Sequence, residues 1–568
     1  MNGVRRSQNP PIWAPQRELW RARLFLVAVL FLLGFGGLAL RAFTLAVAEA
    51  PHLTSEARAA ASAGREGDQH PRRRALRDRH GRLLAVNLPV QSLYADPRRL
   101  LDPPAEVAAR LAAILPDVDR RQITARLSSD RRFVWVKRFL TPDEVRAVLD
   151  LGIPGLGLMK EERRVYPLGP LFAHAVGFTD ADGRGLMGAE RALDRRLAAQ
   201  GGEKGEAVYL SFDVTVQEAL RESLDAARTR FSAKAAAGLV MDLDSRGLLA
   251  LVSLPDFDPN HPGSAPPEAL FNRVTQGVFE LGSVFKIFTL AAALERGIAP
   301  DTRFDVRKPV VVPGGFRIHD DHPLKRPVSL IEAFAHSSNI AFAQLAERLG
   351  DEGLQTAFRR FGLLDPMPAP YRETATPLVP ARWRHANTLT AAFGHGIAVS
   401  PLQLATSVAA VAGDGFLRPA TVLRDDRTEG PRVLADSTVR RLRAAMRLVV
   451  LRGTGRQAAV SGLQLAGKTG TAEKVIDGVY HPDRLLSSFV ALLPAAQPRY
   501  LIFVMLDEPQ GTAETAGFAT AGWTAAPTAA RVAERIAPTL GLLPRRAEEE
   551  EDAMVRRFSR LITEEAAG

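Results

Sequence analysis

Residues 238–253, GLVMDLDSRGLLALVS, contain two runs of β-forming residues on either side of a short polar segment. The runs cover 238–243 and 248–253, and residues 244–247, DSRG, have the composition of a tight turn. This pattern predicts a β-hairpin. Since the sequence before it is less regular, we expect a new domain to begin close to Ala237.

Two further β runs, 487–493 and 500–506, lie near the other end of the same region and are joined by the turn-forming residues 494–499. Residues 523–536 then follow a helical hydrophobic period. Between the two pairs of strands, helical periodicity recurs in three long segments, namely 284–297, 330–349 and 402–412. We therefore expect an α+β domain whose sheet is built from both ends of the region, with a large helical insertion.

The residues before this domain have a more mixed pattern. Short apolar runs at 83–86, 133–136 and 176–178 are typical of strands, whereas 105–115 is amphipathic with a helical period. Residues 57–82 are rich in alanine, arginine and glycine, which predicts a solvated linker. The sequence thus predicts a mixed α and β region between this linker and the second domain.

The composition limits the kinds of protein that this chain can be. It has 568 residues, of which 46% are hydrophobic and 24% charged, so it is neither disordered nor collagen-like nor wholly membrane-embedded. The formal net charge is +11, but the basic residues are scattered through every region, which disfavours nucleic-acid binding. Cysteine is absent, which excludes disulfides, thiolate metal sites and cysteine nucleophiles.

An uncharged apolar run near the N-terminus predicts a membrane anchor. Residues 24–40 carry no charge, and apolar residues continue after Arg41, so the expected anchor covers 24–47. Arginines precede this segment and are missing directly after it, so the positive-inside rule places residues 1–23 in the cytoplasm and the remainder outside. A cleaved signal peptide, with small residues at 46–48, is the alternative, but its apolar run would usually be shorter.

The segment Ser283-Val284-Phe285-Lys286 is the only place where a lysine lies three residues after a serine. It opens an apolar helical run, so both side chains would share one helix face and the amine could reach the hydroxyl. A neutral lysine, its pKa lowered by burial or by another cation, could accept the serine proton and produce a nucleophile. By itself, however, this pattern more often marks a helix start without chemistry.

Two later segments carry matching polar groups. Ser337-Ser338-Asn339 offers a hydroxyl and an amide two residues apart, although a turn or helix cap would also explain it. Lys468-Thr469-Gly470-Thr471 precedes the closing strands and contains the only Lys-Thr-Gly of the chain. Because the chain has only nine lysines, chance would produce this tripeptide well below ~0.1 times.

In this order and spacing, the three motifs resemble those of the penicillin-binding, serine D,D-transpeptidase superfamily. The chain is similar in particular to the monofunctional class B transpeptidases, and among these to the FtsI-like, division-specific branch. Further matching segments are 73–84 (RRALRDRHGRLL), 132–140 (RFVWVKRFL), 163–167 (RRVYP), 185–190 (GLMGAE), 255–260 (PDFDPN) and 393–396 (FGHG). Two local departures are Arg74, where glycine is usual, and Glu280-Leu281-Gly282, where Glu-Pro-Gly is usual.

The resemblance implies a domain order. An elongated periplasmic pedestal of mixed α and β structure would cover 48–230, and a serine β-lactamase-like transpeptidase domain, with an antiparallel sheet and a helical subdomain, would cover 231–545. The acidic tail at 546–568 is expected to be a solvated end without chemistry. The protein would be a single-pass protein of the cell inner membrane, with its N-terminus in the cytoplasm and its catalytic domain in the periplasm.

The resemblance also implies a reaction. Ser283 would attack the penultimate D-alanine carbonyl of a peptidoglycan stem peptide with Lys286 as general base, and the acyl group would then pass to an amine on a neighbouring strand. The remaining implied roles are proton relay by Ser337, substrate binding by Asn339, Lys468, Thr469, Gly470 and Thr471, and an oxyanion hole made by the backbone N–H groups of Ser283 and Thr471. Neither a metal nor an organic cofactor is implied.

The partners implied by the resemblance are peptidoglycan stem peptides, β-lactams as covalent inhibitors, and membrane proteins of the divisome. The most important of these is a polytopic SEDS-family glycosyltransferase (FtsW-like). We therefore expect septal peptidoglycan cross-linking during cell division. The alternatives are an elongation-specific class B transpeptidase and a non-catalytic β-lactam-binding sensor or scaffold.

Two histidine-containing segments resemble sites of other kinds. His319-Asp320-Asp321-His322 resembles a metal-ligand cluster, but consecutive residues cannot all face one ion, so we expect no metal there. His395 lies between two glycines, and a conformational role is favoured over acid or base chemistry.

Overall fold

The computed structural model describes residues 31, 34–36, 38, 73–198, 207–313, 315–542 and 553–562. By their contacts, these residues form two compact units, one that includes 91–160 and one that consists of 73–90 together with the residues from 161 onward. The expected cytoplasmic tail lies outside the described residues, as do most of the expected anchor and parts of the expected C-terminal tail. In the described part of the chain, none of the helices combines the length and the apolar character that a membrane span requires.

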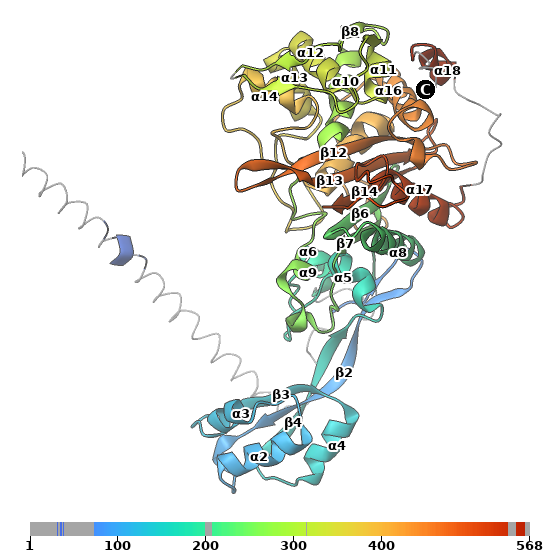
Figure 1. Cartoon of the computed structure of the whole chain (residues 1–568). Coiled ribbons are helices and arrows are strands. Elements are labelled where there is room, and N and C mark those ends of the chain that lie inside the picture. The colour runs from blue at the N-terminus through green and yellow to red at the C-terminus, as the bar shows by residue number, and fades with distance from the viewer. Residues whose placement is uncertain are drawn as a thin grey trace, which may run out of the picture. The chain divides into compact units, whose positions relative to one another are not determined.

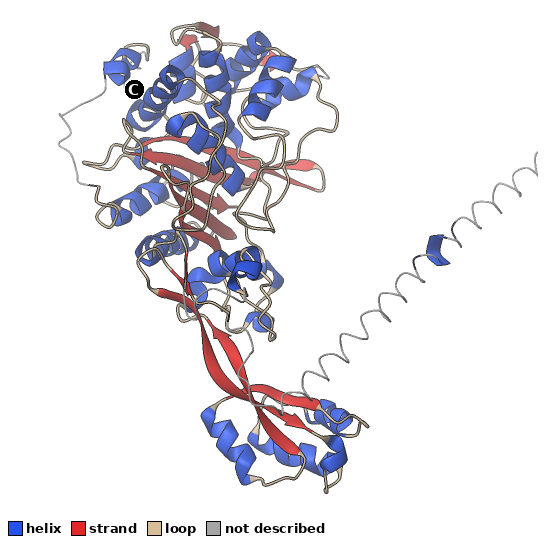
Figure 2. Cartoon of the chain, turned by 180° about the vertical axis from the view of Figure 1, so that it is seen from behind, coloured by secondary structure: helices blue, strands red, loops and turns tan. Residues whose placement is uncertain are grey.

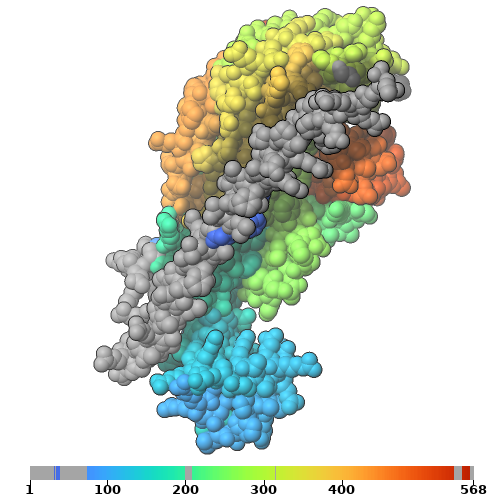
Figure 3. Space-filling view, turned by 90° about the vertical axis from the view of Figure 1, so that its left-hand side faces the viewer, coloured from blue at the N-terminus to red at the C-terminus, as the bar shows by residue number. Residues whose placement is uncertain are grey.

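The unit that includes 91–160, blue in Figure 3, has a hydrophobic core of its own. Strand β3 (Val134–Leu140) pairs antiparallel with the end of β2 (Leu83–Ala95) that enters this unit. Its helices are α2 (Pro104–Ile114), α3 (Arg120–Leu127) and α4 (Pro142–Asp150). The predicted helix at 105–115 and the predicted strand at 133–136 are therefore confirmed, each with a start within a residue or two of its expected position.

The larger unit begins with a small sheet. Strand β1 (Leu76–Arg77) pairs antiparallel with β2 and parallel with β5 (Val208–Tyr209). Just before β1, the buried guanidinium of Arg73 donates to Glu190 at 2.7 Å and to Asp194 at 2.8 Å. The expectation of a solvated linker is wrong for residues 73–82, because these ion pairs offset the cost of burying the arginine.

The main sheet of the larger unit has five antiparallel strands in the order β12-β13-β14-β6-β7 (Figures 1 and 2). Their bounds are Ala466–Ile476, Val479–Leu493, Tyr500–Asp507, Ala235–Asp242 and Leu248–Leu254. The hairpin predicted from 238–253 is β6 and β7, and the second predicted pair is β13 and β14. Because β14 pairs with β6, the two ends of the domain meet at the middle of the sheet.

Both faces of this sheet are covered by helices, which is why β6, β7 and β14 are apolar at nearly every position. On β14, Leu501 and Phe503 belong to the core on one face, whereas Ile502 and Val504 belong to the core on the other. The second core is closed by α8 (Val214–Arg230) and α17 (Ala525–Ile536). The first is closed by the helical subdomain, whose main helices are α10 (Lys286–Glu295), α11 (Leu330–Ala335), α12 (Asn339–Leu349), α13 (Asp351–Arg360), α14 (His385–Ala391), α15 (Pro401–Val408) and α16 (Asp436–Arg452).

Two secondary-structure predictions are wrong. The helix expected at 330–349 is two helices, α11 and α12, because the chain turns sharply at Ser337, whose φ of 63° is left-handed. The strand expected at 176–178 is instead the end of a helical stretch that continues from η2 (Gly169–Phe172) through α5 (Ala173–Val176). Gly177 ends the helical stretch with a left-handed φ of 75°. The buried apolar residues before it therefore belong to a helix and not to a strand.

The C-terminal residues that the structure describes are packed and not solvated, which corrects the expectation for this part of the tail. Helix α18 (Ala553–Ser559) contacts α16, and the side chains of Val555, Phe558 and Ile562 are buried in the first core. The Ser329 hydroxyl also donates to the Leu561 carbonyl at 2.8 Å. The apolar residues after the acidic run therefore have a place in the fold of the larger unit.

Candidate active site

Ser283 and Lys286 lie at the start of α10, where a 3-10 turn, η4 (Gly282–Phe285), leads into the helix. The Lys286 side chain is fully buried, and its Nζ lies 2.9 Å from the Ser283 Oγ. The predicted contact between amine and hydroxyl is therefore present. The 3-10 turn, with its tighter winding, differs from the regular helix start that the sequence suggested.

The break between α11 and α12 brings the second motif to the same lysine. Lys286 Nζ lies 3.1 Å from the Ser337 Oγ and 2.7 Å from the Asn339 Oδ1, and it also donates to the Ser337 carbonyl. The left-handed conformation of Ser337 is costly for a residue other than glycine, and such strain is frequent at functional sites. The break in the helix that was expected at 330–349 therefore lies at the candidate site.

The third motif lies on β12, which pairs only with β13 among the strands that the structure describes. Lys468 is fully buried, and its Nζ donates to the Ser337 Oγ at 2.9 Å and to the Thr469 carbonyl at 3.1 Å. The Ser337 hydroxyl thus lies between the two lysine amines. Three motifs that are far apart in the sequence form one hydrogen-bonded group.

Glycine is required where the nucleophile turn and β12 touch. A Cβ atom on Gly470 would lie 2.3 Å from the Leu281 carbonyl oxygen, and one on Gly282 would lie 2.5 Å from the Thr471 carbonyl oxygen. Gly282 also has a φ of 54°, which other residues rarely adopt. These two glycines let the backbones of the turn and the strand approach each other, which holds Ser283 against the edge of the sheet.

Burial makes the lysines unusual bases. Burial lowers the pKa of Lys286 from its ordinary value to about 7, although the charges of Asp320 and Asp321 act in the opposite direction. Burial, with a smaller contribution from the charge of Lys286, lowers the pKa of Lys468 well below its ordinary value. Near neutral pH, a large share of Lys286 is thus an uncharged amine next to a hydroxyl, which is the arrangement of a general base and a nucleophile.

The two threonines of the third motif have different surroundings. The Thr469 hydroxyl is buried and lies 2.6 Å from that of Thr454, a residue that the sequence analysis did not identify. Thr471 is partly exposed, and its hydroxyl accepts a hydrogen bond from the Ala521 backbone N–H at 3.0 Å. Of the two residues, Thr471 is therefore the one more open to solvent.

A cluster on the rim of the site includes one residue that sequence reasoning missed. The Tyr480 hydroxyl donates to Glu280 at 3.1 Å, and the His395 ring stacks on the Tyr480 ring with centroids 4.3 Å apart. The Gly396 N–H also donates to Glu280 at 3.1 Å. No sequence signal marks Tyr480, because only the pairing of β12 with β13 brings it to this place.

The segment 319–322 has a structural role in the part of the chain that the structure describes. There, no group of three or more histidine and acidic side chains is placed to hold a metal ion. Asp320 is buried and accepts a hydrogen bond from the Ser338 hydroxyl at 2.7 Å. The sequence analysis noted this aspartate but did not connect it with the second motif.

Comparison with known proteins identifies the family of both parts of the chain. The family described as "Penicillin binding protein transpeptidase domain" matches residues 236–530, and the family described as "Penicillin-binding Protein dimerisation domain" matches residues 68–208. All three motifs lie inside the first match. The second covers most of the region that the sequence analysis expected to be a pedestal.

Two curated relatives are similar over most of their length. The probable peptidoglycan D,D-transpeptidase FtsI of Caulobacter vibrioides is 42% identical over 479 residues, which cover 82% of this chain and 81% of the relative. The peptidoglycan D,D-transpeptidase FtsI of Escherichia coli is 30% identical over 467 residues, which cover 77% of this chain and 79% of the relative.

The fold is also similar to that of a solved structure. Penicillin-binding protein 3 from Mycobacterium tuberculosis, in complex with aztreonam, matches with a TM-score of 0.65 and 25% identity. The match covers 84% of this chain and 98% of that one. With the motifs, the family matches and these relatives in agreement, the chain belongs to the class B penicillin-binding proteins, as an FtsI-like peptidoglycan D,D-transpeptidase of the serine type.

Proposed function

We propose that this enzyme cross-links septal peptidoglycan during cell division and that Ser283 is its nucleophile. The observation that carries the proposal is the Lys286 amine, which is fully buried, lies 2.9 Å from the Ser283 hydroxyl and forms no ion pair with a carboxylate of the residues that the structure describes. When Lys286 is neutral, the serine hydroxyl can donate its proton to the amine while the oxygen attacks the penultimate D-alanine carbonyl of a stem peptide.

The attack forms a bond between the serine oxygen and the carbonyl carbon and breaks the peptide bond to the terminal D-alanine. Backbone N–H groups of Ser283 and Thr471 stabilise the oxyanion in this proposal, and the close approach of η4 to β12 supports their pairing. The leaving amine takes a proton through Ser337, whose hydroxyl is within hydrogen-bonding distance of both lysines. An amine on a neighbouring strand then attacks the acyl-enzyme carbonyl, which forms the new amide bond and breaks the ester bond to Ser283. The proton that this amine loses returns to the serine oxygen through Lys286.

The remaining groups of the third motif bind the substrate. Lys468 contributes positive potential toward the terminal carboxylate when it is protonated, and Thr469 and Thr471 donate hydroxyl hydrogen bonds to the same group. Asn339 holds a substrate amide through its side chain. The edge of β12 supports this role, because backbone groups that lack a neighbouring strand can pair with an extended peptide.

The cellular setting is part of the proposal. A single anchor at 24–47 keeps residues 1–23 in the cytoplasm and the pedestal and transpeptidase domains, 48–230 and 231–545, in the periplasm. The uncharged run at 24–40 supports the anchor, and the FtsI names of the relatives support the septal role. The partners would be an FtsW-like SEDS glycosyltransferase and other divisome proteins, and β-lactams would be covalent inhibitors.

Covalent labelling of the membrane-bound full chain by a fluorescent penicillin tests the chemistry. We expect a long-lived adduct that disappears in Ser283→Ala and remains in Ser264→Ala, a matched change at an exposed serine outside the site. No adduct on folded wild-type protein would contradict the catalytic role, and an adduct that is quickly hydrolysed would favour a β-lactamase.

Localisation tests the septal role. A fluorescent fusion of the full chain should gather at mid-cell, and depletion should block division before it changes cell width. Labelling along the side wall would favour an elongation enzyme. Normal division of a strain that carries only Ser283→Ala would favour a non-catalytic scaffold.

A further inference from the structure

Asp320 has an unusual position for an acidic side chain. It lies on the loop after β10 (Arg317–Ile318) and is almost completely buried, while its neighbour Asp321 is exposed. One carboxylate oxygen accepts from the Ser338 hydroxyl at 2.7 Å, and the other accepts from the Ile340 backbone N–H at 2.9 Å. Both bonds reach the segment that contains Ser337 and Asn339.

The same loop holds this segment at a third point. The carbonyl of His319 accepts a hydrogen bond from the Asn339 Nδ2 at 3.1 Å, and the Asn339 Oδ1 is the atom that contacts Lys286. Two consecutive loop residues therefore hold three consecutive residues, 338–340, at the second motif. Hydrogen bonds to a buried carboxylate are stronger than neutral ones, so Asp320 is the firmest of these anchors.

The anchors act where the chain is strained. The local hydrophobic pattern of 330–349 is that of a continuous helix, and Ser337 leaves that pattern with a φ of 63°. The Ser338 hydroxyl, which Asp320 orients, in turn accepts from the Ala341 N–H at 3.1 Å and caps α12. Without the Asp320 carboxylate, the Ser338 hydroxyl would lose the hydrogen bond that fixes it at the start of α12.

Asp320 is also one of the charges that act on Lys286. Burial lowers the pKa of this lysine, and the Coulombic attraction of Asp320 raises it, with Asp321 acting in the same direction. The groups that face the lysine from the surrounding elements are Ser283 on η4, Ser337 and Asn339 at the break, Lys468 on β12, and Asp320 and Asp321 on the loop. Asp320 is the one carboxylate in this group that also holds the motif.

We propose that Asp320 is a positioning residue of the acylation reaction, which holds Ser337 and Asn339 against Lys286 through its hydrogen bonds to Ser338 and Ile340. The inference rests on the proposed function, because it concerns the same acylation step. Asp320 touches no reacting atom, and it acts through the second motif and through its field at the lysine.

The test is the rate of acylation of the full chain by a fluorescent penicillin, measured from pH 5.5 to 9. In Asp320→Asn the amide oxygen can still accept from the Ile340 N–H, so we expect a maximal rate within a few-fold of wild type. The lost charge should move the midpoint of the pH profile to lower pH, by roughly half a unit. In Asp320→Ala the same shift should accompany a maximal rate about 10- to 100-fold lower.

Asp321→Asn is the matched control, because it removes the same charge from an exposed neighbour that solvent screens. Its rate should stay within about twofold of wild type, with a smaller shift of the midpoint. Ser338→Ala provides a second variant that removes the other partner of the 2.7 Å bond and keeps the charge, so its rate should fall without the shift to lower pH. Thermal unfolding of each variant gives the folded fraction by which its rate is divided.

The possible failures are distinguishable. A wild-type rate in Asp320→Ala, or a midpoint that does not move in either Asp320 variant, would overturn this inference while leaving Ser283 labelling intact. Absence of labelling in the wild type would instead overturn the proposed function and, with it, this inference.

Discussion

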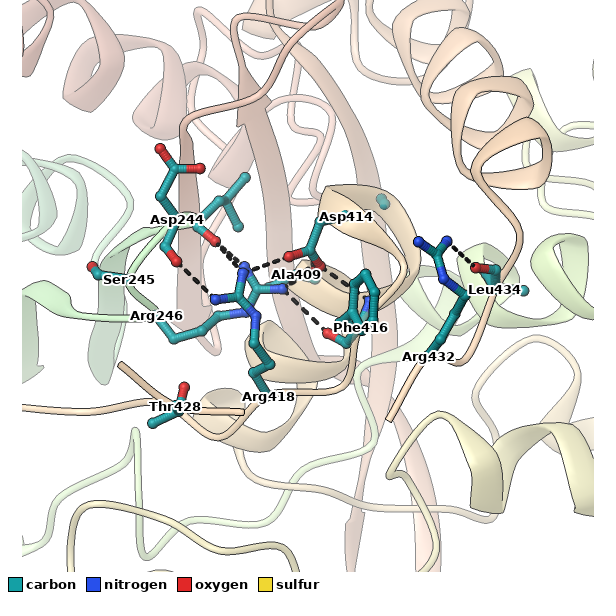
Figure 4. Close-up of polar contacts among 12 residues, drawn as sticks. Asp244, Ser245, Arg246, Ala409, Asp414, Phe416, Arg418, Thr428, Arg432 and Leu434 are labelled. Carbon is teal, nitrogen blue, oxygen red and sulfur yellow. Dashed lines mark hydrogen bonds and ion pairs between the residues drawn. The ribbon is translucent and has the colours of Figure 1, made fainter. Parts of the chain in front are cut away.

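Among the buried cations of the larger unit, those of the active site and the one at a hairpin turn differ in what surrounds them. In the active site, Lys286 and Lys468 are fully buried, and the partners in direct contact are hydroxyl, carbonyl and amide oxygens. At the hairpin of β6 and β7, Arg246 is also fully buried, but it forms an ion pair with Asp414 at 2.6 Å (Figure 4). Within the described part of the chain, the lysines have no carboxylate in contact, whereas the arginine is paired with one.

The arginine group joins two distant parts of the fold. Arg246 lies in the hairpin turn and donates to the carbonyls of Ala409 and Phe416, which flank the segment that follows α15. Arg418 donates to Asp414 and, at 2.8 Å, to the Asp244 carbonyl, so the hairpin turn is held at two points. Figure 4 shows both guanidinium groups directed at the same carboxylate.

The difference follows from the chemistry of the two side chains. Burial lowers the pKa of Lys286 to about 7, within the range where it exchanges its proton. Burial lowers the pKa of Arg246 as well, but a guanidinium starts so high that it stays charged and needs a counter-charge. The buried lysine, whose pKa lies near neutrality, is thus suited to proton transfer, whereas the buried arginine, which stays charged, is suited to a structural ion pair.

We expect the largest effect for Lys286→Met, which should change the acylation rate strongly and the free energy of unfolding only slightly. The acylation rate should fall by about 10³-fold, because the proposed general base is lost. The free energy of unfolding should change by less than about 2 kcal/mol, since methionine fills similar volume without the desolvation cost of a buried amine, which offsets the loss of a donor to the Ser337 carbonyl and the Asn339 Oδ1. Penicillin labelling kinetics and urea unfolding measure the two quantities.

A fall of several kcal/mol in the unfolding free energy of Lys286→Met would break the comparison, because the lysine would then be a structural cation. Lys160→Met, at an exposed lysine of β4 (Leu156–Val165), is the matched control and should leave both quantities near those of wild type.

The opposite pattern is expected for Arg246→Met. The free energy of unfolding should fall by about 3 kcal/mol, because the carbonyls of Leu243, Ala409 and Phe416 lose this donor and Asp414 loses its fully buried partner. The acylation rate of the folded fraction should remain near that of wild type. Urea unfolding gives the first quantity, and labelling corrected for the folded fraction gives the second.

Arg432 offers the control for that prediction, because it is half-exposed and pairs with Asp436 on the surface at 2.7 Å. Arg432→Met should lower the free energy of unfolding by less than about 1 kcal/mol. Equal losses in Arg246→Met and Arg432→Met would show that burial of the ion pair makes no difference.

The acylation rate should also depend on pH, with a smaller effect than that of the substitutions. Since the pKa of Lys286 is about 7, the neutral fraction of the base rises with pH, and acylation should be about tenfold faster at pH 8 than at pH 6. The acylation rate measured in buffers that span pH 6 to 8 checks this. A rate that falls as pH rises from 6 to 8 would mean that the protonated lysine is the active form.

Four strands of the main sheet were predictable because each contains a largely apolar run with turn residues next to it. The hairpin from 238–253 and the pair at 487–493 and 500–506 are present as expected. The break at Ser337 was not predictable, since the residues on both sides have helical periodicity and the turn is held by Asp320 from another segment. Local pattern cannot reveal a boundary that a distant carboxylate imposes.

The sequence pattern also could not predict the burial of certain charged and C-terminal residues. Arg73 reads as part of a polar linker, and its burial depends on Glu190, more than a hundred residues later in the chain. The acidic run in the tail predicts a solvated end. The apolar residues after it are nevertheless buried, because α18 packs on α16. In both cases the partner that stabilises the buried group is remote in the sequence.

By itself, the sequence singled out Ser283, Lys286, Ser337 and Lys468 as the candidate reacting groups, since the order and spacing of the three motifs and the rarity of the third point to them. The tertiary structure alone decided the electrostatics of the site. The motifs lie tens to more than a hundred residues apart, and only packing around β12 brings their polar atoms within 3.1 Å and excludes water from both lysines. Proton affinity depends on that desolvation, which is a property of the folded surroundings and not of the residue type.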